Sequence, residues 1–206
     1  MTLREIFRSG RIIPVITIPE VEAGVALSRA LVAGGLNVLE ITLRTPVALD
    51  ALRAVKAALP DAIVGVGTVM TPAQLAEAKA QGAAFAVSPG LTPALMDAAA
   101  EIGLPLLPGA QTVSEVMRAR EAGFTFLKFF PAESTGGIAT LKDFAPVFPD
   151  VGFCPTGGIS LANTPDYLAQ PNVMCVGGTF MIPKQSQAAG DWAAVEAAAR
   201  SARALG

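Results

Sequence analysis

The sequence predicts an α/β protein in one domain over residues 1–206, folded as a closed (β/α)8 barrel that follows a short N-terminal helix. Eight short apolar runs rich in β-branched residues recur along the chain, separated by alanine- and leucine-rich segments of helical length. The runs are apolar at nearly every position, which is typical of parallel strands covered by helices. A length of 206 residues is at the short end of what this barrel needs, so we expect tight loops.

The expected elements follow from these runs and from local start and stop signals. Thr71-Pro72 and Thr92-Pro93 place a capping hydroxyl before a proline, which predicts helices over 72–81 and 93–102, and Ser160 is interpreted as a third cap. Glycines are expected at four helix ends, namely Gly35, Gly82, Gly103 and Gly123. Strands are expected at 12–18, 38–43, 62–66, 84–88, 104–107, 126–130, 152–155 and 173–176.

This order of elements fixes the end of the barrel at which function is expected. Residues that follow each strand lie at the carboxyl end, where (β/α)8 barrels carry their active sites. The alternative architecture is an open, doubly wound sheet. It is less favoured because no strand is followed by GxGxxG and because eight regular repeats fit a closed ring better.

Composition limits the classes of partner. The net charge is -2 and no basic run occurs, so a nucleic-acid partner is not expected. No apolar run approaches the roughly 18 residues of a membrane span, and the N-terminus lacks a secretory signal. Cys154 and Cys175 have no CxxC spacing and are expected to be buried free thiols of a soluble, cytoplasmic protein, although a disulfide stays open. Small molecules are the expected partners.

The chain has no histidine, which removes several mechanisms. Serine or cysteine nucleophiles activated by imidazole and histidine-ligated zinc sites are excluded. Acidic residues do not cluster at the expected strand ends, so we expect neither a metal nor a cofactor.

Lys128 is the most informative residue. It lies in the apolar run Phe124-Thr-Phe-Leu-Lys-Phe-Phe-Pro131, whereas the other four of the five lysines lie in helical or loop-like segments. A lysine in an apolar pocket can lose its proton, and the neutral amine can then attack a ketone to form a Schiff base. The alternative is a strand-end lysine whose stem lies on apolar surface while its head reaches water.

The second expected strand carries polar side chains on one face. Glu40, Thr42 and Arg44 alternate with apolar residues, so a period of two directs all three to the barrel interior or its mouth. Glu40 and Arg44 are about 13 Å apart along the strand, which favours separate roles. Glu40 could transfer protons and Arg44 could bind a carboxylate. A structural ion pair between Glu40 and another strand is the alternative.

Glycines follow several other strands. Gly65-Val-Gly-Thr68 would let a ligand approach the backbone, and Ser88-Pro-Gly90 forms a turn. Paired glycines after the last two strands, Gly157-Gly158 and Gly177-Gly178, predict a phosphate site of backbone N–H groups. A phosphorylated sugar or triose is the expected ligand.

Taken together, six segments closely resemble the 2-keto-3-deoxy-6-phosphogluconate (KDPG) / 4-hydroxy-2-oxoglutarate aldolase family. They are Leu39-Glu-Ile-Thr-Leu-Arg-Thr45, Gly65-Val-Gly-Thr68, Ser88-Pro-Gly90, Phe129-Phe-Pro-Ala-Glu133 after Lys128, Cys154-Pro-Thr-Gly-Gly158 and Gly177-Gly178. The resemblance implies a homotrimeric class I aldolase on a TIM barrel that cleaves KDPG to pyruvate and glyceraldehyde 3-phosphate in the Entner-Doudoroff pathway. Some members also split 4-hydroxy-2-oxoglutarate.

The resemblance also implies roles, with Lys128 forming the Schiff base and Glu40 acting as general acid and base. It assigns binding of the pyruvate carboxylate to Arg44 and Thr68, and the walls of the pocket to Pro89 and Phe130. It assigns preference for the gluconate epimer to Thr156. The phosphate is assigned to the residues after the last two strands, namely Gly157, Gly158, Gly177, Gly178 and Thr179. Relatives often have serine at position 179, and Arg11 is a further candidate phosphate contact. Three alternatives stay open: an aldolase for the galactonate epimer, a non-covalent isomerase or epimerase that uses Glu40 as base, and a non-catalytic binding barrel in which Lys128 contacts an anion.

Overall fold

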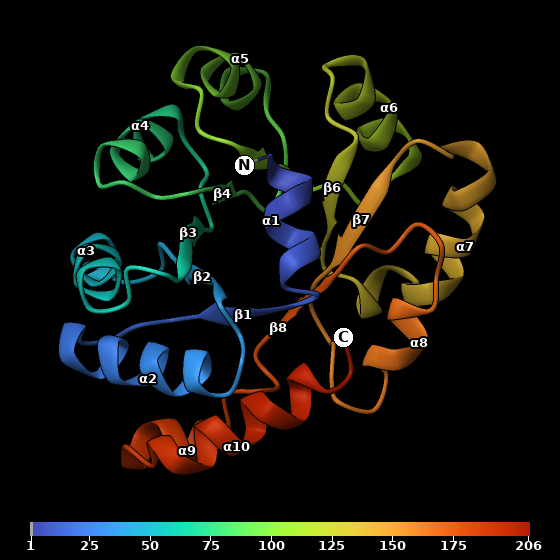
Figure 1. Ribbon diagram of the computed structural model, residues 1–206. Helices are drawn as coiled ribbons and strands as arrows, with labels where there is room; N and C mark the ends of the chain where they lie inside the picture. Colours follow the sequence, from blue (N-terminus) through green and yellow to red (C-terminus); the bar gives the residue numbers. More distant parts are fainter. Residues whose placement is uncertain (1) are drawn as a thin grey trace.

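The computed structural model describes residues 2–206 and has strands at its centre with helices around them (Figure 1). The eight strands occur in the expected order: β1 Ile12–Ile16, β2 Val38–Thr42, β3 Ile63–Gly67, β4 Ala86–Val87, β5 Leu106–Leu107, β6 Phe126–Phe129, β7 Gly152–Pro155 and β8 Val176–Gly178. All registered pairs between them are parallel.

The helices follow the strands as the sequence predicts. They are α1 Leu3–Ser9, α2 Val21–Ala33, α3 Ala48–Ala58, α4 Pro72–Ala80, α5 Pro93–Ile102, α6 Val113–Glu121, the 3-10 turn η1 Glu133–Thr135, α7 Gly137–Val147, α8 Thr164–Leu168, α9 Lys184–Ala189 and α10 Trp192–Arg203. The hydroxyls of Thr71 and Thr92 accept from the third amide of α4 and α5, so both predicted caps are confirmed.

The strands form two sheets. Six of them pair in the order β5-β4-β3-β2-β1-β8, and β6 pairs with β7. An isolated parallel bridge links Gly109, after β5, to Lys128 of β6. A second one links Thr156, after β7, to Gly177 of β8. The strand β5 is only two residues long because Pro105 and Pro108, which flank it, have no N–H to donate to a ladder. The structure therefore shows a curled parallel sheet of six strands and a separate pair.

Two local predictions were wrong. The last strand was expected at 173–176 but lies at Val176–Gly178, because its glycines pair through the backbone with β1, and backbone pairing needs no apolar side chain. Ser160 does not cap α8, which begins at Thr164 after Asn163. Instead, the Ser160 hydroxyl accepts from the amide of Asn163 in the preceding turn.

Apolar side chains fill the interior at the amino ends of the strands. The ring of Phe7, on α1, lies 5.0 Å from that of Phe85 and 5.4 Å from that of Phe126, both edge to face. Helix α1 lies across the centre of the strands at this end (Figure 1). Cys154 and Cys175 belong to the same interior cluster and are free and buried, as predicted.

A second apolar layer lies between the strands and the outer helices. Leu39 and Ile41 belong to it, whereas Glu40 between them points to the interior. The period-two prediction for β2 is therefore confirmed. Over residues 2–206, the structure contains no helix with the length and apolar character needed to span a bilayer.

Candidate active site

The interior holds a buried ion pair between β6 and β2. Nζ of Lys128 lies 3.5 Å from Oε1 of Glu40, and the two residues are 4% and 3% exposed. The Lys128 head therefore does not reach bulk water, which excludes the strand-end alternative. Oε1 of Glu40 has no hydrogen-bond partner among the described residues. A buried amine and an unsatisfied carboxylate oxygen thus face each other, an arrangement suited to proton transfer at a nucleophilic nitrogen.

The space for this carboxylate comes from β3. A Cβ at Gly67 would overlap Oε1 of Glu40, and a Cβ at Gly65 would overlap the ring of Phe85. The two glycines were expected to let a ligand approach the backbone. That interpretation was wrong, because the space beside the two glycines is occupied by the side chains of Glu40 and Phe85 and not by a ligand.

The carboxyl ends of β2 and β3 bring a cation and a hydroxyl together. Nε of Arg44 donates to Oγ1 of Thr68 at 3.1 Å. Thr68 has φ +60°, the single non-glycine residue with positive φ among residues 2–206. Such backbone strain is concentrated at functional sites. Arg44 is exposed, so its guanidinium is open to an anion from solvent.

Phe130 and Pro89 come after the strands β6 and β4. The Phe130 ring centroid is 5.1 Å from Nζ of Lys128, within range of a cation–π contact. The exposed Pro89 follows β4, and a Cβ at Gly109 would overlap its carbonyl. Both therefore stand at the carboxyl end of the strands, and Phe130 is in contact range of the amine.

The glycines after β7 and β8 also meet at this end. Gly157 and Gly158 have φ of +100° and +79°, values that favour glycine. Within residues 2–206, the amides of Gly157, Gly158 and Thr179 donate to no backbone acceptor. Thr156 is bridged to Gly177, and a Cβ at Gly177 would lie 2.5 Å from Oγ1 of Thr156. Free N–H groups on adjacent loops are suited to an anion.

A profile described as "KDPG and KHG aldolase" matches residues 3–198. The chain belongs to the KDPG and KHG aldolase family. The predicted resemblance is therefore confirmed, and its specific motifs lie at the carboxyl ends of the strands.

Individual relatives agree with this assignment. The chain is 50% identical over 197 residues to the "KHG/KDPG aldolase" of Escherichia coli, covering 96% of this chain and 92% of the relative. It is 47% identical to the "2-dehydro-3-deoxy-phosphogluconate aldolase" of Pseudoalteromonas atlantica, with coverage of 97% and 93%. It also superposes on KDPG aldolase from Legionella pneumophila with a TM-score of 0.95, 44% identity and 98% of each chain covered. That structure contains pyruvate as a covalent carbinolamine.

Arg11, the further candidate for contact with phosphate in this aldolase-family chain, does not lie with the other site residues. Arg11 precedes β1 and therefore stands at the amino ends of the parallel strands, opposite the glycine loops. Its guanidinium donates to the carbonyl of Leu168 at 3.2 Å. The suggestion that Arg11 contacts phosphate was therefore wrong, because a residue that directly precedes a strand lies at the amino ends of the parallel strands, opposite the glycine loops.

No pattern in the sequence predicted the hydrogen bond between Tyr167 and Glu133, which supports the loop at Gly158. The hydroxyl of Tyr167, on α8, donates to Oε1 of Glu133, and a Cβ at Gly158 would overlap the Glu133 side chain. Burial, and then the Glu133 carboxylate, raise the pKa of Tyr167 above its ordinary value. The only available signal was that Tyr167 is the one tyrosine of the chain.

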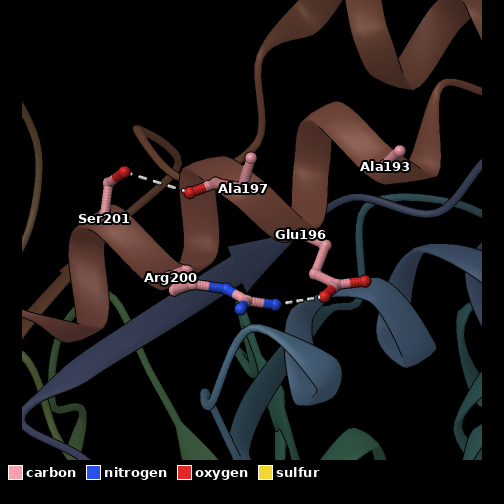
Figure 2. A pocket seen from close by; sticks show the side chains of 5 residues that line it. All are labelled: Ala193, Glu196, Ala197, Arg200 and Ser201. Carbon is pink, nitrogen blue, oxygen red and sulfur yellow. Dashed lines mark hydrogen bonds and ion pairs between the residues drawn. The ribbon is translucent and has the colours of Figure 1, made fainter.

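Other features do not add to the site. A cavity of about 510 Å³ is lined by Ala193, Glu196, Ala197, Arg200 and Ser201 of α10, with an ion pair between Arg200 and Glu196 (Figure 2). It is formed by one outer helix and includes no strand-end residue. Among residues 2–206, no group of three or more histidine, cysteine, aspartate or glutamate side chains is placed to hold a metal.

Proposed function

We propose that this protein is a class I aldolase, a lyase that cleaves KDPG to pyruvate and glyceraldehyde 3-phosphate and also acts on 4-hydroxy-2-oxoglutarate. The observation that carries the proposal is the buried Lys128 amine 3.5 Å from an unsatisfied oxygen of Glu40. The names of the E. coli and P. atlantica relatives and the carbinolamine of the L. pneumophila enzyme support it.

In the proposed cycle, Lys128 as a neutral amine attacks C2 of the keto acid, and loss of water gives an iminium. Glu40, directly or through a water molecule, removes the proton of the C4 hydroxyl, and the electrons of the C3–C4 bond move into the iminium. Cleavage releases the aldehyde and leaves an enamine. Glu40 returns the proton to C3, and hydrolysis releases pyruvate and the free amine. Glu40 can serve every proton transfer because its free oxygen faces the amine.

The binding groups follow the positions described above. Arg44 and Thr68 bind the pyruvate carboxylate, and the Arg44–Thr68 hydrogen bond of 3.1 Å supports their joint action. Pro89 and Phe130 form pocket walls, and Thr156 selects the configuration at C4. The phosphate binds at the glycine loops, through Gly157, Gly158, Gly177, Gly178 and Thr179, supported by the free amides there.

The architecture and state of the protein are part of the proposal. The bridges Gly109–Lys128 and Thr156–Gly177 support closure of the two sheets into one (β/α)8 barrel, a single domain over residues 1–206. The family resemblance supports a homotrimer. Two buried cysteines that remain free are compatible with a reducing, cytoplasmic location.

The test is reductive trapping. Borohydride with pyruvate should add one reduced pyruvyl group to Lys128, as located by peptide mass spectrometry. A binding barrel or a non-covalent isomerase would take no label, and a stable label on another lysine would overturn the assignment. Release of pyruvate, coupled to lactate dehydrogenase, then compares KDPG, its galactonate epimer and 4-hydroxy-2-oxoglutarate; we expect KDPG to be the best of the three.

A further inference from the structure

The end of β1 carries a hydroxyl that none of the roles above uses. Ile13 belongs to the interior cluster, so by a period of two Thr17, just beyond β1, faces the same way. Oγ1 of Thr17 lies 3.0 Å from Oγ1 of Thr42, which is on the Glu40 face of β2. Thr42 is two residues beyond Glu40, so its backbone lies roughly 7 Å nearer the carboxyl end than that of Glu40, and Thr17 lies beside it.

The direction of the hydrogen bonds in this pair is fixed by proton count. A threonine hydroxyl has one hydrogen to donate. Thr42 donates its hydrogen to the carbonyl of Ile16 at 3.0 Å, so in the Thr17–Thr42 contact Thr17 is the donor. The free lone pairs of Thr17 can then only accept. The Thr17 backbone is held from the other side, because Nε2 of Gln187 on α9 donates to its carbonyl at 3.3 Å.

The sheet order places this acceptor beside a defined part of the substrate. β1 lies between β8 and β2. In the proposed function the carboxylate binds at the ends of β2 and β3, and the phosphate at the loops after β7 and β8. The carbon chain between them therefore passes β1. In the proposed cycle Glu40 takes the proton of the C4 hydroxyl, and C6 bears the phosphate. The C5 hydroxyl is therefore the group that remains to donate a hydrogen bond to Thr17.

We propose that Thr17 is a specificity-determining residue that accepts a hydrogen bond from the C5 hydroxyl of the phosphorylated substrate, with Thr42 fixing its orientation. This inference rests on the proposed function. It has a consequence for substrate choice, because C5 of 4-hydroxy-2-oxoglutarate is a carboxylate carbon without a hydroxyl. Thr17 therefore favours KDPG over 4-hydroxy-2-oxoglutarate.

The experiment compares Thr17→Val with Thr17→Ser on both substrates. We expect Thr17→Val to lower kcat/KM for KDPG by about 3- to 10-fold, the range of one neutral hydrogen bond. The value of kcat/KM for 4-hydroxy-2-oxoglutarate should stay the same. Thr17→Ser keeps the hydroxyl and should behave like the unmodified protein. Equal losses of kcat/KM on both substrates, or no loss on KDPG, would overturn the assignment.

A substrate analogue tests the same contact without a mutation. With 5-deoxy-KDPG, the unmodified protein should lose a similar factor, and Thr17→Val should then cause no further loss. A further loss of equal size would show that Thr17 acts on something other than the C5 hydroxyl. Pyruvate trapping at Lys128 involves neither C5 nor the phosphate and should be the same in all variants. If the unmodified protein fails to trap pyruvate, the proposed function itself is wrong, and the role of Thr17 is lost with it.

Discussion

Lys128 and Glu40 form the only buried ion pair among residues 2–206, with 3.5 Å between Nζ and Oε1. The other three pairs are on the surface and contribute little to stability. Removal of one partner from a buried pair leaves an uncompensated charge, which typically costs about 3 to 5 kcal/mol. Variants at either position therefore change both chemistry and stability, and the two effects must be measured separately.

Replacement of the lysine separates them. Lys128→Ala should abolish turnover and pyruvate trapping and should also lower the free energy of unfolding, because Glu40 is left buried without its partner. Lys128→Arg keeps a cation beside Glu40 but cannot form a Schiff base. It should be equally inactive while losing less stability in urea-induced unfolding. Measurable turnover in folded Lys128→Arg would contradict a covalent role.

Glu40→Gln tests the proton transfers. The amide is nearly isosteric with the carboxylate but cannot accept the C4 proton, so turnover should fall about 100- to 10,000-fold. The lysine remains in place, and reductive trapping of pyruvate should still occur, more slowly. Near-normal turnover measured by the coupled assay would remove Glu40 from the mechanism.

Gly67→Ala tests whether the position of the carboxylate matters. The added methyl group would overlap Oε1 of Glu40, so this side chain must leave its present position beside Lys128. We expect a strong loss of turnover together with roughly 1 to 3 kcal/mol of destabilisation from overpacking. Gly90→Ala is the matched control, because its Cβ would meet no atom within 4 Å. Equal activity in the two variants would show that the packing of Glu40 against β3 is not needed.

The single tyrosine allows a pH experiment. Its raised pKa means that the folded protein holds the phenolic proton more tightly than the unfolded chain. Above the ordinary value near 10, the unfolded chain loses this proton first, so stability falls as the pH rises. Tyrosinate absorbance, which reports only Tyr167, should appear at a higher pH than in denaturant. Tyr167→Phe should remove this part of the alkaline loss of stability, and an unchanged slope would show that the pKa of Tyr167 is not raised in the folded protein.

The sequence predicted the parts of the fold that depend on apolar pattern and local signals. Strand order, the helix starts after Thr71 and Thr92, and the inward face of Glu40 all follow from periodicity and capping. The position of the last strand was predicted wrongly, because a strand that pairs through the backbone of glycines has no apolar pattern in the sequence. The shortness of β5 follows from its flanking prolines, which a search for apolar runs does not weigh.

The site was predicted as far as residue type reveals chemistry. Lys128 and Glu40 stand out because charged groups are rare in buried strands. The contacts of Gly67 with Glu40 and of Tyr167 with Glu133 join residues far apart in the chain, and no local pattern marks them. The prediction for Arg11 was wrong for a related reason, because a polar residue beside a strand shows which end of the strands it occupies only when the direction of the strand is considered.

Helix α1, which fills the amino-terminal end of the interior with Phe7, limits the route by which molecules reach Lys128. Because that end is closed, molecules reach the amine only from the carboxyl side. A keto acid must therefore enter from that side, and both products of the proposed reaction must leave by it. In the proposed reaction pyruvate stays bonded to Lys128 until hydrolysis, so the aldehyde departs first by this route, and in the direction of synthesis pyruvate must bind before the aldehyde does.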